Sequence, residues 1–179
     1  MSSINEIHNV TVGDVFLVPV DDASGYIGQI IGSYSAAIYV VILDSRIDLP
    51  LSEVDSDSAR DSALETRPIF GTLTYDSRFR SGMWKLIGHR PTNGKHFLPA
   101  YKTGDPGLGN CMVESFDGRQ RRIASVAEWE TLPHRGIISA MAIDRAVLWH
   151  AGRDQGGPFI EKLRYDDQVM LSQDIFPEK

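Results

Sequence analysis

The stretch DVFLVPV at residues 14–20 decides the fold, together with YIGQII at 26–31 and AIYVVIL at 37–43. All three runs are rich in β-branched and aromatic residues, which are typical of strands. The links between them, DDASG and GSYSA, carry turn residues. Three strands with such short links predict an antiparallel meander. The first and third strands are apolar at both odd and even positions, so we expect both faces of the sheet to be covered.

Further elements follow on the C-terminal side. Residues 67–75 and 84–88 resemble strands, and 111–116 with 120–124 flank an Asp117-Gly118 hairpin turn. Ser125 and Glu128 match a capping box, which predicts a short helix ending near Pro133. A last strand is expected within residues 159–171. Pro19 has no backbone N–H to donate, so we expect it at a sheet edge or a bulge.

The strongest helical signal lies at residues 136–150 (GIISAMAIDRAVLWH), which are apolar almost all round. A helix of that kind is normally buried. The predicted fold class is therefore α+β, with a twisted, mainly antiparallel sheet, either open or barrel-like, packed by one long C-terminal helix.

Length and composition predict a single domain over residues 1–179, with 42% apolar and 23% charged residues. One cysteine, Cys111, cannot form an internal disulfide. Met1–Asn9 shows no signal-peptide pattern, and no uncharged apolar run reaches the roughly 18 residues of a membrane helix. We therefore expect a cytoplasmic protein without membrane contact.

The negative charge is concentrated in one stretch. Residues 44–65 hold seven acids and two bases, a net charge of −5, out of −6 for the whole chain. This balance disfavours nucleic-acid binding, which needs a basic surface. Few apolar residues and no firm period predict an acidic loop at about 44–65. The loop is either simply solvated or a docking surface for a basic partner, and the candidate partner-binding residues are Glu53, Asp55, Asp57 and Asp61.

No pattern for catalysis is visible. The sequence contains no G-x-S-x-G elbow, phosphate-binding loop or H-E-x-x-H zinc pattern. The surroundings of Cys111 favour a buried, inert thiol over a nucleophile. Asp55, Asp57 and Asp61 lack the turn glycine of a calcium loop. We expect no catalytic residue, no metal ligand and no cofactor, and hence no enzyme.

Two sequence motifs carry a resemblance to a known family. Residues 12–20 (VGDVFLVPV) followed by 25–30 (GYIGQI), and residues 81–88 (SGMWKLIG), occur in the order and spacing of the immunity protein 26 family of bacterial polymorphic toxin systems. Weaker similarities lie at 74–76 and 145–149. The resemblance implies a small protein that binds and neutralises a cognate toxin domain. If the acidic stretch at 44–65 faces this domain, its charge favours a basic toxin such as a nuclease. The acidic stretch departs from the family pattern.

The residues of these motifs also have a purely structural interpretation. Gly13, Gly28 and Gly88 suit closely packed backbone, and Phe16 and Trp84 suit a core. Two alternatives to an immunity protein remain open at this point. One is a small-molecule or regulatory binding module on a curled β-sheet, and the other is an enzyme without a sequence signature.

Overall fold

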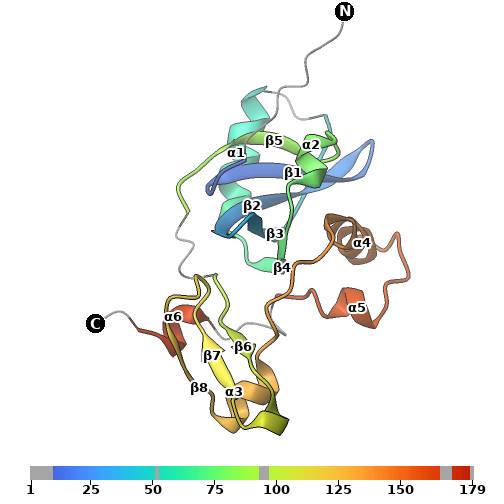
Figure 1. The fold of residues 1–179 in the computed structure, drawn as a ribbon. Coiled ribbons are helices and arrows are strands. Elements are labelled where there is room, and N and C mark those ends of the chain that lie inside the picture. The colour runs from blue at the N-terminus through green and yellow to red at the C-terminus, as the bar shows by residue number, and fades with distance from the viewer. Residues whose placement is uncertain (1–9, 51–52, 93–96, 166–170, 178–179) are drawn as a thin grey trace, which may run out of the picture.

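The computed structural model describes residues 10–50, 53–92, 97–165 and 171–177. Its elements form two groups in space (Figure 1). In chain order they are β1 (Asp14–Asp21), β2 (Ser24–Tyr34), β3 (Ala37–Asp48), α1 (Glu53–Leu64), β4 (Pro68–Thr74), α2 (Ser77–Arg80), β5 (Lys85–His89), β6 (Tyr101–Thr103), β7 (Met112–Glu114), β8 (Arg121–Ile123), α3 (Val126–Thr131), α4 (Ala140–His150), α5 (Pro158–Glu161) and α6 (Ser172–Ile175).

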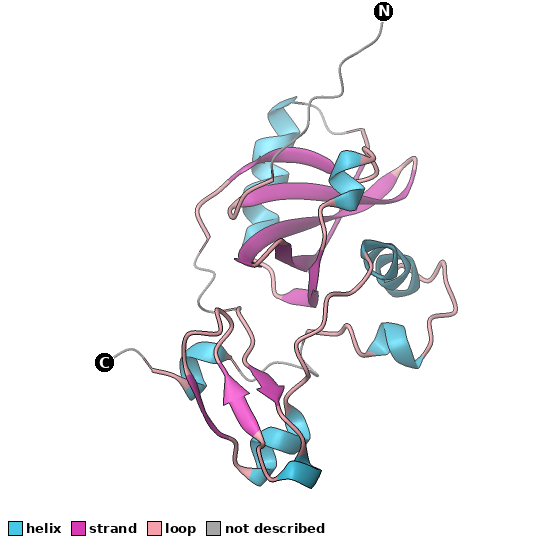
Figure 2. Cartoon of the chain, viewed as in Figure 1, coloured by secondary structure: helices cyan, strands magenta, loops and turns pink. Residues whose placement is uncertain are grey.

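Strands β1 to β5 form one antiparallel sheet with the order β4-β3-β2-β1-β5. The predicted meander is confirmed, because β1 pairs with β2 and β2 with β3. Pro19 is exposed and lies where the β1–β2 register shifts, as expected for a bulge. The sheet is open in the described part of the chain, so the barrel-like alternative is wrong (Figure 2).

Both faces of this sheet are buried, as the two-parity apolar pattern predicts. Phe16 and Val18 of β1 lie in one core cluster, and their neighbours Val15 and Leu17 lie in another. Helices α4 and α2 supply side chains to the first cluster, whereas α1 supplies Ala63 to the second. The sheet is therefore the middle layer of the larger group of elements.

The smaller group is built on the three-stranded antiparallel sheet β6-β7-β8. The predicted hairpin around Asp117-Gly118 joins β7 to β8. The capping box is present at the start of α3, and the helix ends at Thr131, with Leu132 as its C-cap just before Pro133. Its own core is small: Ala100, Val113 and Leu132 are buried, and Phe176 is packed against them.

The C-terminal helix is shorter than predicted. Helix α4 has 11 residues, begins at Ala140 instead of residue 136, and buries one face while leaving Met141 61% exposed. Ser139 caps the helix by accepting from the Met141 N–H at 3.4 Å. The preceding residues are held in an extended form, because the Ile138 N–H donates to the Leu73 carbonyl at 2.8 Å.

The acidic stretch is not a loop. Asp44 and Asp48 lie in β3, and residues 53–64 form the helix α1. Arg60 and Ala63 on the buried side of α1 face the sheet, with Leu64 packed beside them. The sequence pattern concealed this helix because a buried arginine occupies one of the positions that an amphipathic helix usually fills with an apolar residue.

The expected last strand is also absent from the described residues after Phe159. Residues 158–161 form the helical turn α5, since Pro158 suits a first helical turn and has no N–H for a ladder. The chain then pairs with β4 by a single antiparallel bridge between Phe70 and Arg164. The Gly71 N–H donates to the Leu163 carbonyl at 3.3 Å, so this segment covers part of the free edge of β4.

Candidate partner-binding surfaces

Helix α1 presents the acidic residues that the sequence selects as candidate partner-binding residues. Arg60 anchors it: the residue is 5% exposed, and its Nη1 donates to the Ile87 carbonyl of β5 at 2.6 Å. A Cβ on Gly88, whose φ is +155°, would lie 2.2 Å from this nitrogen, so the glycine of the second motif is required by the close approach of Arg60. The anchor fixes which side of α1 faces solvent.

Asp57 and Asp61 lie on that outer side, with side chains 68% and 58% exposed. Asp57 pairs with Arg60, and Asp61 accepts from the Arg90 Nε at 2.9 Å. The structure thus brings two of the four predicted residues together and gives each an arginine partner. Glu53 and Asp55 lie on the same helix, but their side chains are outside the described residues.

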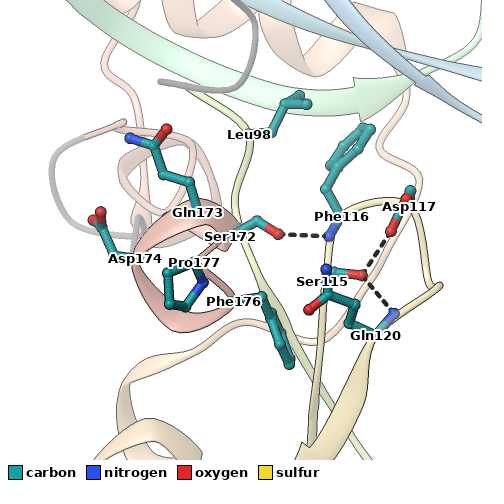
Figure 3. Close-up of a pocket in the computed structure, with 10 residues that line it drawn as sticks. All are labelled: Leu98, Ser115, Phe116, Asp117, Gln120, Ser172, Gln173, Asp174, Phe176 and Pro177. Atoms are coloured by element: carbon teal, nitrogen blue, oxygen red, sulfur yellow. Dashed lines mark hydrogen bonds between the residues drawn. The ribbon is translucent and has the colours of Figure 1, made fainter. Parts of the chain in front are cut away.

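A pocket of about 510 Å³ lies beside the β7–β8 turn (Figure 3). Apolar side chains from three separate segments line it, and two carboxylates, Asp117 and Asp174, stand among the polar ones. Figure 3 shows Leu98 and Phe116 on one side of the pocket and Phe176 on another. The lining residues are Leu98, Ser115, Phe116, Asp117, Gln120, Ser172, Gln173, Asp174, Phe176 and Pro177.

Hydrogen bonds hold the polar groups of this pocket in place. The Ser115 hydroxyl donates to Asp117 Oδ1 at 2.6 Å and accepts from the Gln120 N–H at 3.0 Å. The Ser172 Oγ accepts from the Phe116 N–H at 3.1 Å, which ties α6 to the turn. Ser115 therefore stabilises the turn, because its hydroxyl bonds both to the Asp117 carboxylate and to the Gln120 backbone.

The Asp117 carboxyl is held in its charged form. Burial alone would raise its pKa, but hydrogen bonds from the Ser115 hydroxyl and the Arg119 N–H, with the positive charge of Arg119, lower the pKa below its ordinary value. The arrangement can accept an apolar group between Leu98, Phe116 and Phe176, with a negative charge at its rim.

The motif residues that carry the family resemblance meet in space. The β1 and β5 strands pair, and Phe16 of the first motif stacks on Trp84 of the second at 5.0 Å between ring centroids. Trp84 is 2% exposed, and its Nε1 donates to Asp144 Oδ1 on α4 at 2.7 Å. Arg78 pairs with the same carboxylate. The structural interpretation of Phe16 and Trp84 as core residues is confirmed.

Arg135 is a key residue that the sequence analysis missed. It joins the two groups of elements: its guanidinium lies 3.8 Å from the Tyr34 ring centroid and 4.4 Å from that of Tyr101. It also pairs with Glu114 at 2.9 Å and donates to the Phe116 carbonyl at 2.5 Å. A single arginine in a turn-rich stretch carries no pattern, so no sequence signal marks it.

The remaining candidate groups show little clustering. No three His, Cys, Asp or Glu side chains come together to hold a metal ion within the described ranges. Cys111, which directly precedes β7, is partly exposed and not buried as expected. None of the described helices is long and apolar enough to cross a membrane.

Comparison of the chain with protein-family models, with curated proteins and with solved structures found no match.

Proposed function

We propose that this protein is an immunity protein that binds and neutralises a cognate bacterial toxin domain, as the family resemblance implies, and that it is not an enzyme. The observation that carries the proposal is the meeting of the two motifs: they form adjacent strands, and Phe16 stacks on Trp84, which is 68 residues later in the sequence. Motifs that share one structural unit are better support for a family resemblance than isolated strand-like patterns.

The negative charge of α1 supports the proposal that the partner is basic. Residues 53–65 carry five acids against the single base Arg60, so the stretch stays negative even when the nearby Arg90 is included. A toxin that grips phosphate is basic at its active surface, and an acidic helix raises the association rate with such a surface. A nuclease domain is the toxin chemistry that fits this charge best.

The test is co-expression with the product of the neighbouring gene, which the proposal expects to carry the toxin domain. We expect the toxin domain alone to stop growth, and the present protein to restore growth and to co-purify with the domain in a fixed ratio. Restored growth without a complex, or a complex that leaves the toxin active, would contradict the proposal.

Neutralising the acidic side chains of α1 tests whether this helix contributes to toxin binding. Changing Glu53→Gln, Asp55→Asn, Asp57→Asn and Asp61→Asn together should slow association with the toxin at low salt and flatten its salt dependence, with the fold intact. A matched control neutralises four acids elsewhere, namely Asp22, Asp105, Glu130 and Glu161. Equal slowing by both variants would assign the effect to net charge and remove α1 from the interface.

A second candidate function, a small-molecule binding module, is favoured by the pocket beside the β7–β8 turn. Its volume of about 510 Å³ falls in the range of roughly 300–1,000 Å³ typical of ligand sites, and its walls combine apolar and polar groups. Screening small aromatic cations by amide chemical shifts at Phe116 and Ser172 tests it. A ligand that saturates there and leaves toxin binding unchanged would establish this as a separate activity.

A further inference from the structure

The amino end of α4 opens into a pocket of about 400 Å³ that the proposed function does not use. The pocket lies between the end of β4, the start of α2 and the first residue of α4. Its polar side chains are Thr74, Ser77, Arg80 and Ser139, and its apolar wall is formed by Tyr75, Ile137, Ile138 and Ala140.

Thr74 is the unusual member of this set. The residue is 0% exposed, and its Oγ1 is buried without a hydrogen-bond partner. A buried hydroxyl in a folded protein almost always has a partner, because leaving it unpaired costs free energy. Thr74 lines the pocket, so a ligand placed there can accept the hydrogen bond that the protein itself does not provide.

The charge distribution favours an anion as that ligand. The first turn of an α-helix leaves backbone N–H groups unpaired and carries a partial positive charge. In α4 this turn contains no acidic side chain, and Ser139 caps the Met141 N–H at the rather long distance of 3.4 Å. Arg80, 59% exposed, adds a full positive charge, which its Nε shares with Asp76 at 3.0 Å.

The apolar wall indicates what the anion is attached to. Tyr75 and Ile137 are 49% and 43% exposed, which leaves an uncovered apolar surface next to the polar groups. A hydrated inorganic anion gains nothing from such a surface, whereas an aliphatic chain does. We propose that this pocket binds a carboxylate carried on an apolar group, held by the Thr74 hydroxyl, the first turn of α4 and Arg80. The site is independent of the proposed toxin binding.

The experiment titrates the full-length protein with butyrate, with the uncharged butyramide of the same shape, and with inorganic phosphate. Amide chemical shifts of Ile138, Ala140 and Met141 report on the pocket. We expect saturable shifts with butyrate and none with butyramide. Equal affinity for butyramide would overturn the requirement for charge, and tighter binding of phosphate would overturn the requirement for an apolar group.

Two variants test the residues that hold the carboxylate. Thr74→Val keeps the shape, removes the unpaired hydroxyl and should weaken butyrate binding by about tenfold, the size expected for a lost hydrogen bond to a charged group. The matched control is Thr72→Val on the same strand, where Oγ1 already has a partner, the Leu73 carbonyl at 3.4 Å. Unchanged butyrate affinity in Thr74→Val would overturn the proposal.

Arg80→Gln provides a second test that does not depend on the core. It should weaken butyrate binding, whereas Arg119→Gln should not, although Arg119 is likewise exposed and likewise paired with a nearby aspartate, Asp117. Equal affinity of the two variants for butyrate would remove Arg80 from the site and contradict the proposed role of its charge.

Discussion

The two sheets of this protein are stabilised in different ways. In the five-stranded sheet, β1 and β3 bury consecutive side chains on both faces, so apolar burial dominates. In the three-stranded sheet, all three residues of β8 are exposed and its own apolar core is a few residues around Val113, while Tyr101 and Phe116 are buried against the first sheet. The smaller sheet instead depends on charged side chains that bond to backbone and carboxylate groups.

Arginine and lysine side chains form these bonds in the smaller sheet. Arg135 bonds to Glu114 and to two carbonyls of the β7–β8 turn, Arg122 pairs with Glu128 through both terminal nitrogens, and Lys102 donates to the Trp129 carbonyl at 2.8 Å. The comparison teaches that apolar substitutions should act most strongly in the first sheet, and substitutions of charged residues in the second.

The largest expected effect is that of Trp84→Ala. The change removes the ring stacked on Phe16 and leaves Asp144 without its hydrogen bond from Nε1. We expect a loss of about 3–5 kcal/mol in the free energy of unfolding, measured by urea denaturation. Trp84→Phe keeps most of the ring and should lose clearly less. A Trp84→Ala protein that is as stable as the parent but fails to bind its partner would make Trp84 an interface residue.

The next largest loss of stability is expected for Arg135→Ala, which affects the three-stranded sheet. It leaves the Glu114 side chain, 17% exposed, without its cation and removes the bonds to the Ser115 and Phe116 carbonyls. We expect a loss of about 2–3 kcal/mol in the free energy of unfolding, less than for a fully buried pair because some exposure remains.

Hydrogen exchange shows whether this loss is local. The amide of Val113 in β7 should exchange faster in Arg135→Ala, while the amides of Ile30 and Val41 in the first sheet stay protected. Arg135→Lys keeps the charge but not the planar fork, so it should restore only part of the stability. Faster exchange at all three amides alike would show that the two sheets unfold as one unit and would break the comparison.

The first sheet was predictable from the sequence, and much of the second was not. Burial of both faces of the sheet follows from runs such as residues 37–43, where every residue is apolar. The capping box at Ser125 was equally readable because it depends on two residues at a fixed spacing. By contrast, β6, β7 and β8 have three residues each, too few for a period to appear, so β7 and β8 were predictable only through the Asp117-Gly118 turn between them, and β6 was not.

The candidate surfaces were predictable in composition but not in geometry. The sequence located the acidic residues, but Arg60 at a buried position concealed the helix that carries them. Arg90, the partner of Asp61, is 29 residues away in sequence, and such a pairing depends on the tertiary fold. The pocket at the start of α4 depends on Thr74, whose missing hydrogen bond is visible only in three dimensions.

A smaller effect, and one that depends on pH, is expected at Glu128. Hydrogen bonds from Arg122, aided by those from Ser125, lower the pKa of its carboxyl from 4.5 to about 2. Because the folded state holds the proton less tightly than the unfolded state, the stabilisation is complete above pH 4.5 and is lost as the pH falls toward 2. Glu128→Gln should lower stability at neutral pH by about 1–2 kcal/mol, a value reduced because Arg122 is partly exposed.

The measurement is urea denaturation of both proteins between pH 2 and 7. The parent should lose stability more steeply than Glu128→Gln in the acid range, so that the two curves converge. Parallel curves would show that the ion pair with Arg122 does not form in solution, and that the smaller sheet depends less on charged side chains than the comparison states.

The smallest loss of stability is expected for Asp61→Asn. Together with Arg135→Ala, it contrasts an arginine–carboxylate ion pair in each of the two regions. Arg90–Asp61 and Arg135–Glu114 both have nitrogen–oxygen distances of 2.9 Å, but the side chains of the first pair are 36% and 58% exposed and those of the second 16% and 17%. Water screens the exposed pair and competes for its hydrogen bonds, so we expect Asp61→Asn to cost about 0–1 kcal/mol, and the difference from the parent to disappear at high salt. The first sheet keeps its apolar core in this variant and therefore its stability. A loss as large as that of Arg135→Ala would mean that α1 is held to the sheet mainly by its outer ion pairs, and the contrast between an apolar and a charge-dependent region would no longer hold.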